Sequence, residues 1–308
     1  MKNIINVPLH CACGITLLFG SFAPVAAQQP DTESSEGEAR TRGLWNDAFL
    51  QQRIAATGAK IVVRARKIAP ASAQAVKDLG NSFVGLTLWR MRKSASSDPN
   101  AVRFRGLVHP DDISDTEEWT PERVSLNNPV LPKEYVRLSI ESARKGYLYV
   151  IDRDSYPDGT TGPANLIFPT NTLRGGDNKV EPGKPIEIPD ANDRNPVFRL
   201  DKTRPDQTAV LLTIIVAPEP IPGLVIGRKA QKLTNEQVKE WENKWGSQVS
   251  RLESKADAGK AYTPAEQAAG KQSLALGEDD PVPLTLFHCN AKQGDTMLVS
   301  VPIILGKR

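Results

Sequence analysis

The segment from Tyr135 to Pro169 constrains the fold of this chain more than any other part of the sequence. It contains three apolar pieces, Tyr135–Glu141, Gly146–Ile151 and Ala164–Phe168, which are separated by clusters of glycine, proline and aspartate. In the first piece, valine, leucine and isoleucine alternate with arginine, serine and glutamate, the period-two pattern of a strand with one buried face. A short Arg-Lys-Gly turn follows it, as in β-hairpins. We therefore expect antiparallel hairpins here and a chain rich in β-structure.

Strand patterns continue on both sides of this segment. Phe83–Met91 alternates, with Val84, Leu86 and Leu88 on one face. Ala209–Ala217 is apolar on both faces, and we expect it in the middle of a sheet that is covered on both sides. Further short strands are expected at Lys184–Ile188, Val197–Leu200, Leu284–Cys289 and Thr296–Leu305, the last two joined by a turn. The predicted fold class is mainly β: an antiparallel β-sandwich with a few flanking α-helices, and α+β structure at the C-terminus.

Helical patterns are concentrated between the last strands. Leu233–Leu252 begins with a capping box at Thr234, and it carries an apolar stripe at helical spacing. That stripe consists of Val238, Trp241, Trp245, Val249 and Leu252. Thr263–Glu266 repeats the start signal for a second helix, in which Gly270 costs about 1 kcal/mol relative to alanine. Thr120–Glu122 gives another helix-start signal, with proline in the first turn.

Residues 1–27 have the pattern of a secretory signal peptide. Lys2 supplies a positive start, Cys11–Phe22 is a short apolar run, and Val25–Ala27 offers small residues to a signal peptidase. The run is too short and too interrupted for a transmembrane helix, which needs about 20 apolar residues. We expect cleavage after Ala27 and a periplasmic or secreted protein. An uncleaved amphipathic start is the alternative.

The remaining sequence predicts a linker and one domain. Residues 28–43 contain no apolar residue beyond Ala39, so they cannot bury enough surface to become ordered and are expected to form a flexible tether. Residues 44–308 are predicted to form a single sandwich-like domain with a helical insertion at 234–276. Once the signal peptide is removed, Cys289 is the last cysteine, so the domain is expected to fold without an internal disulfide.

The charge of the chain is nearly balanced. It has 39 basic and 36 acidic residues, a formal net charge of +3, so no strong field attracts a nucleic acid and no nucleic-acid partner is expected. Basic clusters lie at Arg64–Lys67, Arg90–Lys93 and Arg103–Arg105. They can contact an acidic polymer, or they can be solvent-facing charges that protect strand edges from aggregation.

Several phrases of the sequence resemble one family. They are YVRLSIES at Tyr135–Ser142, GYLYVIDRD at Gly146–Asp154, LIFPT at Leu166–Thr170, GGDNKV at Gly175–Val180 and IEIP at Ile186–Pro189. Over about residues 80 to 220 they resemble the family catalogued as domain of unknown function 4384, and the stretches WENKWGSQV and TPAEQAAG resemble a C-terminal extension of some bacterial members. The resemblance implies a compact, sandwich-like accessory module. It implies no catalytic residues, because the family has no established active site.

An acidic turn follows the second apolar piece. Asp152, Asp154, Asp158 and Gly159 give the pattern D-x-D-x-x-x-D-G, which Asp177 and Asn178 can extend. Calcium prefers such closely spaced oxygen ligands, and this makes the three aspartates candidate calcium ligands. The spacing departs from an EF-hand loop, because Tyr156 stands at the fifth position. The alternative is a hairpin exit in which aspartate caps turn amides.

Residues able to act as nucleophiles or zinc ligands are scarce. Outside the signal peptide the chain has two histidines, His109 and His288, and one cysteine, Cys289. His288 and Cys289 are neighbours on a predicted strand, so their side chains point to opposite faces and cannot act as a pair. Cys289 can still meet His109 through the fold, or it can be an apolar filler of the core. No metal site and no cofactor are predicted from these residues.

Two pairs of aromatic residues have two interpretations. Trp241 and Trp245 can form a surface platform for sugar or peptide, or they can belong to a helix face that packs on the sheet. Tyr147 and Tyr149 share one strand face, where they can line a binding surface or stabilise the sheet.

The sequence contains no nucleophile elbow, P-loop or dinucleotide-binding motif. We therefore expect an exported, non-catalytic binding module with a protein or cell-envelope polymer as partner. A secreted hydrolase, with carboxylates or Cys289 at its centre, and a calcium-dependent binding module are the alternatives.

Overall fold

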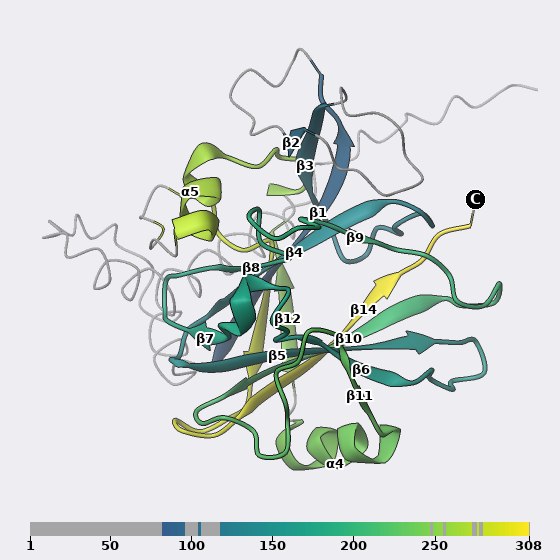
Figure 1. Ribbon diagram of the computed structural model, residues 1–308, viewed down its shortest axis with the longest axis vertical. Coiled ribbons are helices and arrows are strands. Elements are labelled where there is room, and N and C mark those ends of the chain that lie inside the picture. The colour runs from purple at the N-terminus through teal and green to yellow at the C-terminus, as the bar shows by residue number, and fades with distance from the viewer. Residues whose placement is uncertain are drawn as a thin grey trace, which may run out of the picture.

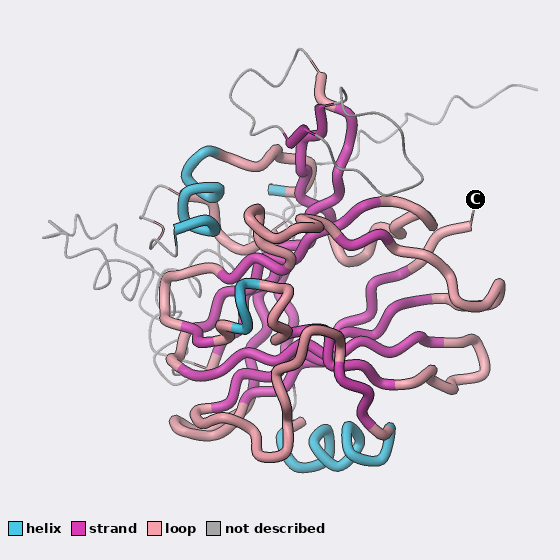
Figure 2. Tube along the Cα trace, in the orientation of Figure 1, coloured by secondary structure: helices cyan, strands magenta, loops and turns pink. Residues whose placement is uncertain are grey.

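The computed structural model describes residues 82–95, 104–105, 118–246, 249–254, 257–272, 276 and 280–307. The expected signal peptide, the linker at 28–43 and His109 lie outside these residues. Two antiparallel sheets pack face to face, and helices lie against their outer faces (Figures 1 and 2). The prediction of a mainly β fold with a few flanking helices is confirmed.

The larger sheet contains eight strands and is built around β1. One edge of β1 pairs with β13 and then with β3, and its other edge pairs with β4. β8 and β9 pair with the far edge of β4, and β2 and β12 extend the opposite side. The strands are β1 (Phe83–Lys93), β2 (Phe104–Arg105), β3 (Glu118–Val124), β4 (Tyr135–Ser142), β8 (Ile186–Ile188), β9 (Phe198–Arg199), β12 (Val249–Glu253) and β13 (Thr285–Cys289).

The smaller sheet contains six strands in the order β11-β6-β5-β10-β14, and β7 also pairs with β5. They are β5 (Gly146–Ser155), β6 (Ala164–Phe168), β7 (Lys179–Val180), β10 (Ala209–Ala217), β11 (Gln231–Leu233) and β14 (Met297–Ile304). β10 lies between β5 and β14 and is buried along nearly its whole length, as its apolar sequence predicted.

The core lies between the two sheets. Val84, Leu86 and Leu88 of β1 point into it, and Ile214 of β10 and Val299 of β14 meet them from the other sheet. All five side chains are at most 1% exposed. Each such side chain contributes about 1.5–3 kcal/mol on transfer from water, so this contact is the main source of stability of the fold.

The turn between β4 and β5 corrects one prediction. We expected a hairpin, but β4 belongs to the larger sheet and β5 to the smaller one, so the turn carries the chain across the core. Gly146 makes this crossing possible, because a Cβ there would overlap the carbonyl group of Ala217 at the end of β10. The expected hairpin of β5 and β6 is present, with a bulge between Val150 and Ile151.

The C-terminal strands make the same kind of crossing. β13 pairs with β1 and β12, whereas β14 pairs with β10. Both strands lie where the sequence placed them, but the turn between them joins the two sheets and does not close a hairpin.

The first helix, α4 (Asn235–Trp245), is shorter than its apolar stripe suggested. The amide of Gln237 donates to the Thr234 hydroxyl, as the capping box predicted. The helix ends at Gly246, where a Cβ would overlap the carbonyl oxygen of Glu242. Val249 then begins β12, so the prediction that the helix continues to Leu252 is wrong.

In place of the predicted helical insertion at 234–276, the chain forms two helices with the strand β12 between them, and each helix covers a different sheet. α4 packs against the smaller sheet, where Trp241 joins a cluster with Tyr149 of β5 and Leu298 of β14. α5 (Pro264–Gln272) lies near the larger sheet at the other side of the molecule (Figure 1). The helix start predicted at Thr120–Glu122 is also wrong, because these residues lie within the strand β3.

Buried charges fasten α5 and the residues before it to the larger sheet. Arg137 of β4 forms an ion pair with Glu187 of β8 at 2.5 Å, and the Tyr262 hydroxyl donates to the same carboxylate. Arg123 of β3 forms an ion pair with Glu266 of α5. All five residues are less than 8% exposed. Removing one partner of such a pair costs about 3–5 kcal/mol, since it leaves an unpaired buried charge.

Gly270 on α5 offers a test of this packing. Alanine favours a helix by about 1 kcal/mol over glycine, but a Cβ at position 270 would overlap the Glu187 carboxylate. We predict that Gly270→Ala lowers the free energy of unfolding by about 1–3 kcal/mol through this overlap. Thermal and denaturant unfolding measure the change.

Lys271→Ala is the matched control, because Lys271 is exposed on the same helix. It should change stability by less than about 0.5 kcal/mol. A Gly270→Ala protein as stable as the unsubstituted chain would show that α5 does not rest on Glu187.

Candidate functional site

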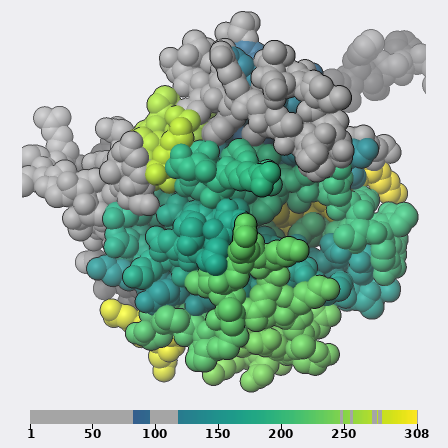
Figure 3. All heavy atoms as spheres, in the orientation of Figure 1, coloured from purple at the N-terminus to yellow at the C-terminus, as the bar shows by residue number. Residues whose placement is uncertain are grey.

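The candidate site is a groove of about 1070 Å³ between the two sheets, which we call the interlayer groove. One wall comes from the larger sheet and contains Tyr135 of β4 and the segment 194–199, which includes β9. The other wall comes from the smaller sheet and contains Ile167 of β6, the turn at 170–173 and the loop residues 228–230. Figure 3 shows the surface hollowed between the teal and green segments, with gold atoms of the C-terminal segment visible inside.

The bottom of the groove is apolar. Ile167, Leu173 and Phe198 are partly buried and pack against the main core. Pro189 and Val197 complete this lining. The volume is at the upper end of the range of about 300–1000 Å³ that is usual for ligand pockets, so the groove can accept an elongated molecule.

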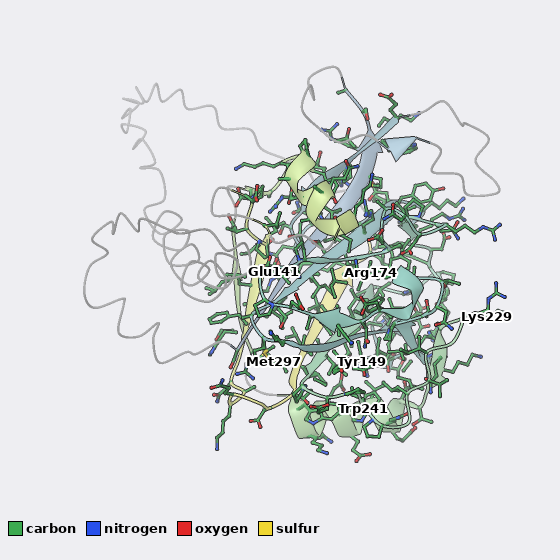
Figure 4. The ribbon with its side chains drawn as sticks, turned by 60° about the vertical axis from the view of Figure 1, so that its left-hand side comes forward. Glu141, Tyr149, Arg174, Lys229, Trp241 and Met297 are labelled. Atoms are coloured by element: carbon green, nitrogen blue, oxygen red, sulfur yellow. The ribbon has the colours of Figure 1, made fainter. Side chains whose placement is uncertain are left out.

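The rim of the groove is cationic. Arg194, Arg199, Arg228 and Lys229 line it, whereas Asp201 is the only acidic residue that does so. The Asp201 carboxylate forms an ion pair with Arg199 at 2.7 Å. The other three cations are exposed and form no ion pair with any residue that the structure describes. Lys229 lies at the periphery of the molecule, away from the other labelled residues (Figure 4).

Hydrogen bonds hold the loop that carries Arg228 and Lys229. The amide of Asn171 donates to the Gly227 carbonyl at 2.7 Å, and the Thr172 hydroxyl donates to the Arg228 carbonyl at 3.2 Å. The amide of Val225 donates to the Gln231 side chain at 3.0 Å. The cationic side chains therefore project from a backbone that the smaller sheet positions.

The acidic turn is held by hydrogen bonds of its own. Asp154 accepts from the Thr203 hydroxyl and from the Gln207 amide, each at 2.6 Å. Asp158 accepts from the amide and hydroxyl of Thr160, as an aspartate that caps a turn does. These bonds lower the pKa of the Asp158 carboxyl, whereas burial raises the pKa of Asp152.

Asp177 and Asn178, which the sequence offered as additional calcium ligands, lie far from the acidic turn. Asp177 and Asn178 precede β7, which pairs with Gly146 and Tyr147 at the start of β5. Asp154 lies near the other end of that strand, about seven residues or roughly 23 Å away. In the described part of the chain, no three histidine, cysteine or carboxylate side chains group as metal ligands.

Cys289 lies in the core. Its side chain is 0% exposed and belongs to the cluster between the sheets. Burial raises the pKa of the thiol to about 12, against a smaller opposite effect of Arg144. His288 points away from it and packs against Phe83 with the two rings tilted by 44° and their centroids 4.8 Å apart. Cys289 is therefore packed as an apolar filler of the core.

The aromatic pairs serve packing more than binding. Trp241 is 8% exposed, and Trp245 stacks on it with ring centroids 5.7 Å apart. Tyr149 is buried above α4, and its hydroxyl accepts from the amide of Ile221 (Figure 4). Of the three basic clusters, the one in β1 forms ion pairs with its neighbour strand, since Arg90 and Arg92 both contact Glu122.

A second cavity lies beneath α5 and is much smaller. It measures about 20 Å³ and is lined by Thr87, Ser139, Glu141, Arg123 and Glu266, among others. This volume holds about one water molecule, so the cavity has no room for an organic ligand.

No protein-family model matches the chain, and no curated protein or solved structure is detectably similar to it. Among the helices that the structure describes, none has the length and apolar character needed to cross a bilayer.

Sequence reasoning did not find the interlayer groove. Its residues come from five separated parts of the chain, and no motif links them. One local signal was available: the stretch from Leu224 to Ala230 (LVIGRKA) places two cations next to apolar residues after a predicted sheet strand. Val225 is indeed 69% exposed and Ile226 41%.

We predict that Cys289 is unreactive in the folded protein. A thiol with a pKa of about 12 is ionised to roughly one part in 10⁵ at pH 7, and this one is also inaccessible. In a Cys11→Ser/Cys13→Ser chain, a thiol reagent should label Cys289 only after denaturant is added. Rapid labelling of the native chain would contradict the burial of Cys289.

We also predict that Asp154 stabilises the acidic turn without calcium. Asp154→Ala removes one of the two acceptors of the buried Gln207 side-chain amide, which then keeps only the Ala209 carbonyl, and this should cost about 1–3 kcal/mol. Glu219→Ala, which removes an exposed carboxylate after β10, is the control and should change the melting temperature little. Neither calcium nor a chelator should shift the melting temperature of the unsubstituted chain. A calcium-dependent increase that Asp154→Ala abolishes would establish the calcium site instead.

Proposed function

We propose that this protein is an exported, non-catalytic binding module whose interlayer groove holds an anionic segment of another protein or of a cell-envelope polymer. The observation that carries this proposal is the charge of the groove. Four cations line it against a single carboxylate, and three of the cations have no described ion-pair partner. Because such charges are costly to gather without a counter-charge, an anionic ligand is the complement that fits them.

The shape of the groove supports binding more than catalysis. Its bottom is apolar and opens at the surface, which suits a chain-like ligand that lies along it. The buried carboxylates Glu187 and Glu266 each pair with an arginine and lie on the other face of the larger sheet. A hydrolase centred on Cys289 conflicts with the burial of its thiol. The accessory role implied by the resemblance to domain of unknown function 4384 agrees with a binding module.

The test is retention of polyanions by the purified chain. We expect polyglutamate or polygalacturonate to bind the protein, and Arg228→Glu/Lys229→Glu to weaken that binding about tenfold or more, since both charges are reversed at the groove. Binding should also weaken as salt is added. Fluorescence anisotropy of a labelled polymer measures both effects.

The matched control is Lys179→Glu/Lys239→Glu, which makes the same change of charge at exposed positions on β7 and α4. It should bind as the unsubstituted chain does, apart from a small general loss. If both double variants lose binding equally, the net charge binds the polymer and the groove does not. If neither polymer binds the unsubstituted chain, the proposed function is wrong.

A further inference from the structure

The edge of β9 borders the interlayer groove. β9 pairs with β4 through Tyr135 and Val136, and no other strand that the structure describes pairs with it. Val197, Phe198 and Arg199 follow one another in the chain, and all three line the groove. Successive side chains of a strand point to opposite faces. Phe198 and Arg199 form β9, and a cavity that touches both of them therefore runs along the edge of the strand and not over one of its faces.

The backbone of β9 presents hydrogen-bonding groups to this cavity. Leu200, just after the strand, directs both its groups toward the β4 side: its amide donates to Glu134, and its carbonyl accepts from Lys133. Along an antiparallel strand, residues alternately direct their N–H and C=O toward and away from the partner. Arg199 therefore directs its N–H and C=O away from β4, along the edge that borders the groove.

The side chains on the two walls of the interlayer groove are complementary to an extended polypeptide. Phe198 and Val197 offer apolar contacts, and Arg194 offers a cation on the same wall. Arg228 and Lys229 face the groove from the smaller sheet. An extended polypeptide has apolar side chains for the bottom, carboxylates for the rim, and a main chain that can pair with a strand edge. A sugar polymer lacks the regular N–H and C=O groups that such pairing needs.

We propose that the interlayer groove binds an extended acidic segment of another protein, which adds as a strand to the edge of β9. This inference rests on the proposed function of the groove and names its ligand class. Main-chain hydrogen bonds to Arg199 supply affinity, and the cations at 194, 228 and 229 select acidic side chains. The partner is a polypeptide with glutamate or aspartate next to apolar residues.

The test uses a short peptide of alternating valine and glutamate and its ester analogue. In the analogue, ester links replace the backbone amides, so the N–H donors are lost while the side chains and charges are kept. Isothermal titration against the full chain should show that the peptide binds and that the analogue binds about two- to tenfold more weakly, because the lost hydrogen bond to the Arg199 carbonyl removes roughly 0.5–1.5 kcal/mol. A version with lysine in place of glutamate should not bind.

Variants then locate the site. Arg228→Glu/Lys229→Glu should weaken the peptide about tenfold or more, and Lys179→Glu/Lys239→Glu should not. Equal affinity of the peptide and its ester analogue would overturn strand addition. Polygalacturonate that binds the groove as tightly as the peptide would also overturn it, while leaving the proposed function intact. If neither the peptide nor polygalacturonate binds, the proposed function itself fails.

Discussion

Apolar side chains of β1 and β4 pack against those of β10 and β14, and this contact fixes the position of every other part of the described structure. Two sheets that share one interior must be joined by segments that cross it, and the turns after β4 and β13 do so. Gly146 is needed at one crossing because the chain passes against the end of β10. In the described part of the chain the single cysteine is free and buried, so packing alone keeps the sheets together.

The helices that cover the outer faces of the two sheets are attached by different kinds of contact. α4 covers the smaller sheet with tryptophan and valine, and one ion pair from Arg153 to Glu242 holds it in register. The segment from Tyr262 through α5 is attached to the larger sheet by the buried ion pair Arg123–Glu266 and by the Tyr262 hydroxyl, which donates to Glu187 of the buried pair Arg137–Glu187. Buried pairs add little net stability but are costly to break, so they fix one placement of α5. The interlayer groove lies where neither covering reaches, at the side where β9 and β6 face each other.

The sequence predicted the strands well because their burial is local. Alternation identified β1 and β4, and continuous apolar sequence identified β10 as a strand buried on both faces. Alternation does not show which sheet a strand joins, so the turn after β4 was predicted to close a hairpin, and the turn after β13 could not be assigned to a crossing between the sheets. The apolar stripe in Leu233–Leu252 continues past Gly246, so the periodicity did not show that α4 ends there. Glycine is required at this position because a Cβ would overlap the carbonyl oxygen of Glu242, a contact that only the folded structure reveals.

The candidate site could not be predicted from the sequence, for a related reason. A groove between sheets exists only once both walls are assembled, and its cations are separated by more than 30 positions, from Arg194 to Arg228. The motifs that the sequence did offer make structural contacts in the fold. Asp154 and Asp158 fasten a turn, Cys289 fills the core, and Trp241 anchors a helix.

The most direct test of a binding edge at β9, between the two sheets, is amide hydrogen exchange of the chain measured with and without the valine–glutamate peptide. If the peptide binds at this edge, it should slow exchange at Val197–Arg199 and in the loop 228–230, and exchange around α4 should not change. Protection confined to α4, or no protection anywhere along β9, would contradict the placement of the binding site between the two sheets.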